Sequence, residues 1–340
     1  MTTYATFGDA YRDFSQRVAA APECAPRGER VRELLAVQFT LLDPRARVLS
    51  SPARAWDCGF AAGELCWYLR GAQDLGSISY YSKRMPRWSD DGLTMAGAYG
   101  PRLFMSSGWA RGAEPGADAV VKSQWELARD ELLRDRDSRR AVVVVYAEVD
   151  ALRAACGTRD VPCTLSLQFL ARVPGFSRSC GACDGGFVAD SGVCRSCGTP
   201  RSTRRRLHLV VTMRSCDLVW GLANDQFSFS MLQEIMCVEL REAGLDVELG
   251  SYVHQVASLH VYERHWDLVE RVAAEPPLDS APMPPLTCRR DLDLLLADET
   301  AFREGRRPTP AGYGGAAAWL RAALEGHRAK RDAEAAGGGR

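Results

Sequence analysis

The sequence lacks a net charge, a long apolar segment and a secretory signal. Its 43 lysines and arginines are balanced by 43 aspartates and glutamates, so no overall field draws it to nucleic acid or to a membrane surface. No stretch approaches the roughly 18 uninterrupted apolar residues of a membrane-spanning helix. The first residues, MTTYATFGDAYRDF, place no apolar run after a charged start. We therefore expect a cytoplasmic protein without a membrane or nucleic-acid partner.

Disulfide bonds are not expected either, although the chain contains 12 cysteines. Most of them stand singly in apolar runs, as Cys58, Cys66, Cys216 and Cys237 do, and reduced core thiols of cytoplasmic proteins are placed in this way. With 340 residues and 46% hydrophobic content, the chain has the size of one large globular domain or two ordinary ones. A chain of this size and composition is typical of an enzyme.

The spacing of apolar residues predicts both helices and strands. Apolar stripes at three- and four-residue spacing predict helices over residues 3–20, 59–71, 119–138 and 227–240. Short or alternating apolar runs predict strands over residues 30–43, 139–149, 163–173 and 206–215. The remaining long segments are predicted to form a functional loop over residues 86–118, a proline-rich peripheral arm over residues 274–310 and a disordered tail over residues 326–340.

Four cysteines differ from the rest, because they form two C-x-x-C pairs within an insertion over residues 176–206. The pairs are Cys180 with Cys183 and Cys194 with Cys197. Paired thiolates at this spacing fit tetrahedral Zn²⁺, and a site with four protein ligands is structural because no position stays open for catalysis. A chance cluster and a redox pair are the alternatives. The adjacent RSTRRRLH run could contact phosphate, but a solvated basic face is the simpler interpretation.

Four segments occur in an order that points to one family. They are DSRRAVVVVYAEV, DVPCTLSLQF, RSCDLVWGLANDQFSFS and LHVYERHWDLV, and together they resemble the thymidylate synthase family from about residue 4 to about residue 290. The resemblance implies an α/β fold with a large mixed sheet and flanking helices, built as an obligate homodimer with shared active sites. It assigns residues 1–325 to one catalytic domain, which the zinc-ribbon insertion interrupts.

The matched motifs carry the family's functional residues over to this sequence. Cys163 matches the nucleophile, and Glu64 matches a helix glutamate that acts as general acid and base together with water. The resemblance implies that the phosphate is held by Arg27, Arg214 and, from the partner chain, Arg139 and Arg140. It implies that the rest of the nucleotide contacts Tyr99 and Ser215, and that its ribose contacts His260 and Tyr262. The residues implied to contact folate are Trp88, Asp217, Trp220 and Gly221.

These residue types fit a one-carbon transfer to a pyrimidine nucleoside monophosphate. Carbon C5 of a pyrimidine is a poor nucleophile, and addition of the Cys163 thiolate at C6 activates it, which splits one hard step into easier ones. A guanidinium such as that of Arg214 would lower the pKa of the thiol. The resemblance implies 5,10-methylenetetrahydrofolate as the carbon donor, after which hydride would give a methyl group and water a hydroxymethyl group.

Asp225 decides which base the resemblance favours. In the synthases an asparagine at this position pairs with O4 and N3–H of uracil, and ungapped counting from Arg214 through Gly221 places Asp225 there. A carboxylate accepts from the N4 amino group of cytosine and, with a shared proton, supports N3, whereas it clashes with O4 of uracil. The family's dCMP and CMP hydroxymethylases match this residue. A slip of one residue would place Asn224 there instead, and Asp225 could also be an ordinary N-cap of a helix that begins near Phe227.

Other departures from the synthases point in the same direction. Thr164 stands where they have histidine, and Met85 where they have the first of two tryptophans on the folate ring. The C-terminal RDAEAAGGGR cannot form the apolar segment that excludes water during hydride transfer. The sequence therefore predicts a CMP or dCMP 5-hydroxymethyltransferase. The rivals are a thymidylate synthase or dUMP hydroxymethylase, and a degenerate family member that binds nucleic acid through the zinc ribbon.

Overall fold

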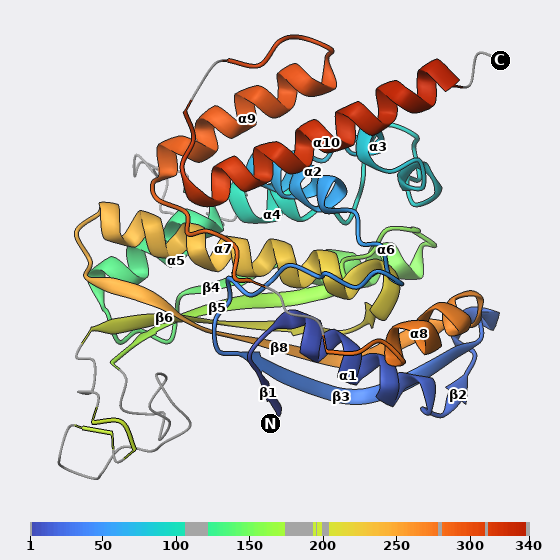
Figure 1. The fold of residues 1–340 in the computed structure, drawn as a ribbon, viewed down its shortest axis with the longest axis horizontal. Helices are drawn as coiled ribbons and strands as arrows, with labels where there is room; N and C mark the ends of the chain where they lie inside the picture. The colour runs from blue at the N-terminus through green and yellow to red at the C-terminus, as the bar shows by residue number, and fades with distance from the viewer. Residues whose placement is uncertain are drawn as a thin grey trace.

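The protein folds around one mixed sheet with most of its helices on one side (Figure 1). The computed structural model describes residues 2–105, 122–173, 193–194, 196–198, 204–277, 281–309 and 312–337. Within these ranges the sheet has eight strands in the order β1-β3-β8-β6-β5-β4, with β2 paired to β3 and β7 to β8. The strands are β1 (Thr2–Tyr4), β2 (Glu23–Cys24), β3 (Val31–Leu41), β4 (Val142–Val144), β5 (Thr164–Arg172), β6 (Arg205–Met213), β7 (Cys216–Asp217) and β8 (Val247–Tyr262).

The helices form layers above the sheet. α7 packs on β6 and β8, α2 and α9 pack on α7, and α10 packs on α2 and α9, whereas α1 packs on β3 and α8. The helices are α1 (Phe7–Ala19), α2 (Cys58–Leu69), α3 (Leu75–Tyr81), α4 (Tyr99–Phe104), α5 (Gln124–Arg134), α6 (Glu148–Ala155), α7 (Ala223–Glu242), α8 (Trp266–Ala273), α9 (Arg289–Arg303) and α10 (Gly315–Gly337); short 3-10 turns are η1 (Pro26–Gly28), η2 (Met85–Arg87) and η4 (Glu263–His265), and η3 (Leu218–Leu222) is a π-turn.

α7 is the central helix of the molecule. Sixteen residues around its circumference are buried, including the polar Gln226 and Gln233, as expected for a helix enclosed between a sheet and a second helical layer. The Gln233 amide donates to backbone oxygens of Leu207 and Gly250, so it ties α7 to the edges of β6 and β8. This enclosure places the first turn of α7 beside the beginning of β5.

The two faces of the sheet differ in burial. Strands β5 and β6 alternate between buried and partly exposed residues, as strands with one core face do. The partly exposed face carries a polar row in which Thr212 donates to Gln255 and Gln255 donates to Gln38, each at 3.2 Å. A face of this kind is left for solvent or for another protein surface.

The sequence predicted most of these elements. Helices 3–20, 59–71, 119–138 and 227–240 correspond to α1, α2, α5 and α7, and strands 30–43, 163–173 and 206–215 to β3, β5 and β6. The strand predicted over 139–149 is wrong beyond Val144, because α6 begins at Glu148. Asp150 explains the change: its carboxylate accepts from the Ala147 amide at 2.8 Å and pairs with Arg102 at 2.6 Å.

The end of the chain also differs from the prediction. Residues 326–337 are not disordered, because α10 continues through Gly337; residues 338–340 lie outside the described ranges. His327 is only 8% exposed and contacts the ring of Tyr81. Gly59 permits this packing, since a Cβ there would lie 2.5 Å from the His327 Cβ. The arm over 274–310 is likewise integrated, because Glu299 of α9 is buried and accepts from Tyr81.

The predicted zinc-ribbon insertion lies between β5 and β6, and much of it lies outside the described residues, including Cys180 and Cys183. The described part contains Cys194, whose sulfur accepts from the Ser196 amide at 3.4 Å, and Cys197. The basic run ends in ion pairs, because Arg204 pairs with Glu248 and Arg205 with Asp137. Among the described helices, none has the length and apolar content needed to cross a membrane.

Candidate active site

Ionisable side chains from four parts of the fold surround one site near the beginning of β5. Cys163 immediately precedes β5, Glu64 lies in α2, Tyr99 begins α4, and Asp225 lies in the first turn of α7. The charge of Asp225 raises the pKa of each of the other three. Because charges act this strongly only over short separations in a poorly solvated region, the structure brings these four predicted residues together.

Arg214 is fixed beside the Cys163 thiol. Its Nε donates to the carbonyl of Pro162 at 2.9 Å, its Nη2 to that of Val161 at 3.0 Å, and Nη2 lies 3.7 Å from Sγ of Cys163. Burial nevertheless raises the pKa of Cys163 to about 11, although Arg214 lowers it. The expected thiolate is therefore not the resting form of this chain, and its proton must leave as the sulfur attacks.

Glu64 is a protonated acid at neutral pH. Burial in α2 and the nearby charge of Asp225 raise its pKa to about 8, against the effect of a hydrogen bond with Tyr68. A carboxyl group whose pKa lies close to the working pH can both give and take a proton. This is the property that the predicted general acid and base requires.

Tyr99 is held by the residue that follows the nucleophile. The Thr164 hydroxyl lies 3.1 Å from the Tyr99 oxygen and the Thr164 amide 3.3 Å from it, and both donate. The Tyr99 O–H is then free to donate toward the site, where burial, and after it the charges of Asp225 and Cys163, raise its pKa. Thr164, which stands where the synthases have histidine, thus fixes the position of the Tyr99 hydroxyl group.

The side chain that faces the site is Asp225 and not Asn224. Asn224 is 8% exposed; its Oδ1 accepts from Nε1 of Trp56 at 2.8 Å, and its Nδ2 donates to the carbonyl of Trp220 at 2.9 Å. Both ends of this amide are engaged within the protein. The one-residue slip that would bring Asn224 to the base would require both of these hydrogen bonds to break.

Asp225 is also not a helix cap. α7 begins at Ala223, directly after η3, and Asp225 lies inside its first turn. The cap of η3 is Asp217, whose Oδ1 accepts from the amides of Val219 and Trp220 at 2.7 and 2.6 Å. Burial raises the pKa of Asp225 to about 7, and a hydrogen bond from Cys216 lowers it.

Gly221 contacts this carboxyl. A Cβ at Gly221 would lie 3.2 Å from both Oδ2 of Asp225 and Sγ of Cys216. The glycine expected at the folate therefore also leaves room for the base-facing carboxyl and its partner.

Trp220, one of the residues expected to hold folate, is flanked by cations, and Asp217 accepts from its backbone amide. The guanidinium groups of Arg264 and Arg84 lie 4.5 and 5.1 Å from the centre of the Trp220 ring. Asp217 Oδ2 is buried without a hydrogen-bond partner in the described part of the chain, and Trp88 is 42% exposed. An orphaned carboxylate oxygen beside an aromatic ring flanked by cations suits a ligand that has hydrogen-bond donors, a flat ring and carboxylates.

The expected phosphate and ribose residues include Arg27 of η1 and Tyr262 of β8, and the Tyr262 ring lies beside that of Trp220, with ring centres 6.1 Å apart. Arg27 adopts a left-handed backbone with φ of 55° in η1 and lowers the pKa of Cys163, so its charge reaches the site. A left-handed arginine is strained, which is common at functional positions. Ser215 lies between β6 and β7, and His260 and Tyr262 follow on β8, with ring centres 5.2 Å apart.

A family model described as thymidylate synthase matches residues 53–299. The chain belongs to the thymidylate synthase family. Its similar proteins include the deoxyuridylate hydroxymethyltransferases of Bacillus phage SP01, 30% identical over 242 residues (70% of this chain, 52% of that one), and of Pseudomonas phage M6, 30% identical over 249 residues (73% and 56%). The chain spans about half the length of these curated relatives. Their names specify deoxyuridylate, whereas the sequence predicts a cytidylate.

The fold agrees with this membership. The structure resembles thermostable thymidylate synthase A from Bacillus subtilis with a TM-score of 0.56 at 17% identity, covering 81% of this chain and 86% of that one. The predicted α/β fold of the thymidylate synthase type, with a mixed sheet and flanking helices, is therefore confirmed.

The arginine pair of the family is not part of the site formed by its own chain. Arg139 and Arg140 are exposed and precede β4. Val142 pairs with Gln168 in antiparallel register, so Arg140 lies near the far end of β5, about 20 Å along the strand from Cys163. These side chains could reach such a site only in another copy of the chain.

Sequence reasoning missed several supporting residues. Cys216 was assigned to the core although it contacts Asp225, and the roles of Trp56 and Tyr68 were not foreseen. The position of Cys216 inside the RSCD motif was a signal, because its neighbours on both sides were assigned to the site. Trp56 gave no signal, since its partner lies 168 residues away.

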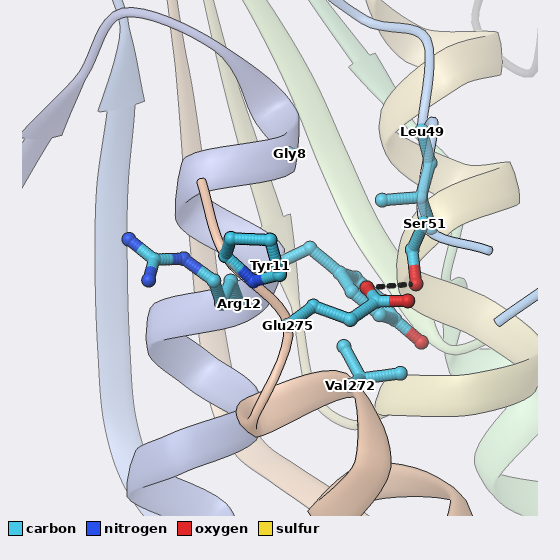
Figure 2. Close-up of a pocket in the computed structure, with 8 residues that line it drawn as sticks. Gly8, Tyr11, Arg12, Leu49, Ser51, Val272 and Glu275 are labelled. Carbon is cyan, nitrogen blue, oxygen red and sulfur yellow. Dashed lines mark hydrogen bonds between the residues drawn. The ribbon is translucent and has the colours of Figure 1, made fainter. Parts of the chain in front are cut away.

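The pocket in Figure 2 is not a second substrate site. It lies between α1, α8 and the segment before α2, where Ser51 donates to Glu275 at 2.6 Å. Its volume of about 10 Å³ holds about one water molecule. A nucleotide cannot enter it.

Proposed function

We propose that this protein is a cytidylate 5-hydroxymethyltransferase, which converts CMP or dCMP with 5,10-methylenetetrahydrofolate and water. One observation carries the choice of base: Asp225 faces Cys163 and Glu64, while the Asn224 amide is engaged by Trp56 and Trp220. A neutral carboxyl group presents one donor and one acceptor. It can therefore donate to N3 of cytosine and accept from the N4 amino group.

The nucleotide would be held by charge at one end and by hydrogen bonds along its length. Arg27 and Arg214 act on Cys163 from within the chain, and guanidinium groups suit a phosphate because of their forked donors and permanent charge. Arg139 and Arg140 of a partner chain would complete this site. His260 and Tyr262 would contact ribose, and Ser215 and Tyr99 would support the nucleotide.

In the proposed reaction, the Cys163 sulfur forms a bond to C6 of the base as the thiol gives up its proton. The electron pair of the C5–C6 double bond becomes available at C5, with N3 protonated through Asp225. C5 would then form a bond to the one-carbon unit of the folate, and the C–N bond to tetrahydrofolate would break as that nitrogen takes the proton of Glu64, whose pKa is about 8. Glu64, now a carboxylate, accepts the C5 proton through water. Water adds to the exocyclic methylene left at C5, and the sulfur leaves C6 with the electron pair of its bond.

Folate fits the residues around Trp220. Trp88 and Trp220 offer aromatic surface, Asp217 offers a carboxylate oxygen without a partner among the described residues, and Arg84 and Arg264 offer positive charge for the glutamate end. When bound there, 5,10-methylenetetrahydrofolate would supply the one-carbon unit. A side chain at position 221 would crowd Asp225, since a Cβ on Gly221 would lie 3.2 Å from its Oδ2.

The product that we propose carries a hydroxymethyl group at C5 rather than a methyl group. The relatives from Bacillus phage SP01 and Pseudomonas phage M6 are named hydroxymethyltransferases.

A dUMP hydroxymethylase is the second candidate, because those same relatives are named for deoxyuridylate. Asp225 can serve uracil too if its proton moves to the oxygen that faces O4. Incubation of the protein with 5,10-methylenetetrahydrofolate and each of CMP, dCMP and dUMP separates the candidates. We expect 5-hydroxymethyl products from a cytidylate; turnover of dUMP alone, or a methyl product with dihydrofolate, would overturn the proposal.

Two further properties belong to the proposal. We infer a homodimer, supported by the partly exposed polar face of the sheet and by the distance of Arg139 and Arg140 from their own Cys163. We also infer a structural Zn²⁺ on Cys180, Cys183, Cys194 and Cys197. The support for this site comes from the described cysteine pair, Cys194 and Cys197. The Ser196 amide donates to Cys194 Sγ, and the amide of Gly198, whose φ is 69°, donates to the Cys194 carbonyl.

A further inference from the structure

Cys216 is a buried thiol that the proposed reaction does not use. It lies in β7, is 2% exposed, and its sulfur is 3.7 Å from Oδ2 of Asp225. The carbonyl of Asp217 is a second acceptor at 3.7 Å. Burial raises the pKa of Cys216 well above its usual range, so the sulfur keeps its proton and acts only as a donor.

The contact with Asp225 is direct, because 3.7 Å lies within hydrogen-bonding distance for a sulfur donor. Gly221 lies against both atoms, at a distance where even a Cβ would be 3.2 Å from each. The hydrogen bond from Cys216 therefore makes Oδ2 of Asp225 an acceptor. If the carboxyl is protonated, its proton is then favoured on Oδ1.

The position of this proton matters, because a neutral carboxyl group could read either base. With the proton on one oxygen it matches cytosine, which offers an acceptor at N3 and a donor at N4. With the proton on the other oxygen it matches uracil, which offers a donor at N3 and an acceptor at O4. Without a fixed neighbour, Asp225 would discriminate poorly between the two.

We propose that Cys216 is the positioning residue that makes base recognition specific: its S–H holds Oδ2 of Asp225 as the acceptor and keeps the carboxyl proton on Oδ1. This inference rests on the proposed function in one respect, namely that Asp225 contacts the base. It does not depend on which base is the natural one. Without the Cys216 donor, the carboxyl proton can occupy either oxygen of Asp225, and the second base can then bind as well.

Burial is the main cause of the raised pKa of Asp225, and the hydrogen bond from Cys216 opposes it. The other ionisable groups that face this carboxyl carry a negative charge or none. These groups are Glu64 and Tyr68 of α2, Tyr99 of α4, Cys163 before β5 and Tyr252 of β8. Removal of the donor should therefore raise the pKa of Asp225 further, and a stronger donor should lower it.

The test compares Cys216→Ala and Cys216→Ser with Cys237→Ala, which removes a buried thiol of α7 that donates to the carbonyl of Val247. The ratio of kcat/KM for cytidylate and uridylate, and its pH profile, are measured on the intact protein. Since the proton on Asp225 is needed for binding, activity falls as pH rises through its pKa, near 7 in the parent protein.

For Cys216→Ala we expect base discrimination to fall about tenfold and the alkaline limb to move up by about one pH unit. For Cys216→Ser we expect base discrimination to be kept and the alkaline limb of the pH profile to move to lower pH. This variant tests the inference if Cys216→Ala does not fold. Parental discrimination and pH profile in Cys216→Ala, or the same changes in Cys237→Ala, would overturn the inference. If the parent protein prefers dUMP, the proposed base is wrong, yet the same loss of discrimination would still support the role of Cys216.

Discussion

The Arg214 guanidinium lies 3.7 Å from the Cys163 sulfur, and two backbone carbonyls keep it there. Its charge lowers the pKa of the thiol, but burial is the larger effect and the pKa rises to about 11. The nucleophile is therefore stored as a thiol in the free chain. Deprotonation belongs to the attack on the nucleotide rather than to the resting state.

This arrangement predicts the reactivity of Cys163 toward iodoacetamide. The rate of alkylation should increase about tenfold for each pH unit between 7 and 9, because only the thiolate reacts. Arg214→Met should slow alkylation at every pH, since the cation that favours the thiolate is lost. Mass spectrometry of the Cys163 peptide, with the exposed Cys156 as internal reference, gives the rates. A rate for Cys163 that stays constant from pH 6 to pH 9 would contradict the storage of the thiol form.

Glu64 should make the protein less stable as pH rises. A carboxyl whose pKa is raised on folding contributes its stability below the unfolded-state pKa and loses it as pH rises through the folded-state value, here about 8. Glu64→Gln stays neutral, so its Tm should exceed that of the parent protein by about 5 °C at pH 8.5 and differ little at pH 5. Thermal unfolding across this range measures the effect, and an equal difference at both values would speak against it. Turnover of Glu64→Gln should be nearly abolished.

Substitution of Asp225 tests the choice of base. In Asp225→Asn the amide presents a fixed donor and acceptor, which match O4 and N3–H of uracil. We expect the ratio of activity on cytidylate to activity on uridylate to fall on the order of a hundredfold. Asn224→Ala is the matched control from the neighbouring position: it should lower Tm and leave the ratio unchanged. An unchanged ratio in Asp225→Asn would mean that the carboxyl does not contact the base.

Shared active sites predict that two inactive variants restore each other. Cys163→Ala lacks the nucleophile, and a variant with both Arg139→Ala and Arg140→Ala lacks phosphate ligands for the partner site. After unfolding and refolding together in equal amounts, about a quarter of the sites should contain all intact parts. Recovery of activity only after mixing would support the homodimer. An inactive mixture of well-folded proteins would count against shared sites.

Zinc binding predicts a metal content and a folding role for the cysteine insertion. The purified protein should contain about one Zn²⁺ per chain, and Cys194→Ser should reduce this content strongly. Cys24→Ser, which changes an exposed cysteine outside the insertion, should not. Elemental analysis after gel filtration measures both. Retention of a full zinc content in Cys194→Ser would exclude Cys194 as a ligand.

The order of the elements and the register of the site could be predicted because they depend on local patterns. Apolar spacing gave α1, α2 and α5, and the interval from Arg214 to Asp225 gave the residue that faces the site. The beginning of α7 could not be predicted, because η3 runs into it without a break and the capping carboxylate is Asp217 rather than Asp225.

The protonation of the site could not be predicted from sequence either. A nearby arginine suggests a thiolate at Cys163, but the balance depends on how much solvent the fold removes from the sulfur. The same holds for Asp225 and Glu64, whose pKa values are raised by burial before any neighbour acts. Burial arises from segments far apart in the chain, since Glu64 lies in α2 and Asp225 in α7.

Asn224 and Asp225 are consecutive, and on a helix their side chains leave the axis about 100° apart. One turn of α7 thus separates two tasks: Asn224 joins Trp56 to the backbone of Trp220, while Asp225 contacts Cys216 at the candidate active site. Under the proposed function, a substitution at position 225 changes the group presented to the base and leaves both hydrogen bonds of Asn224 in place. A change of substrate there would not disturb the contacts that assemble the first turn of the helix.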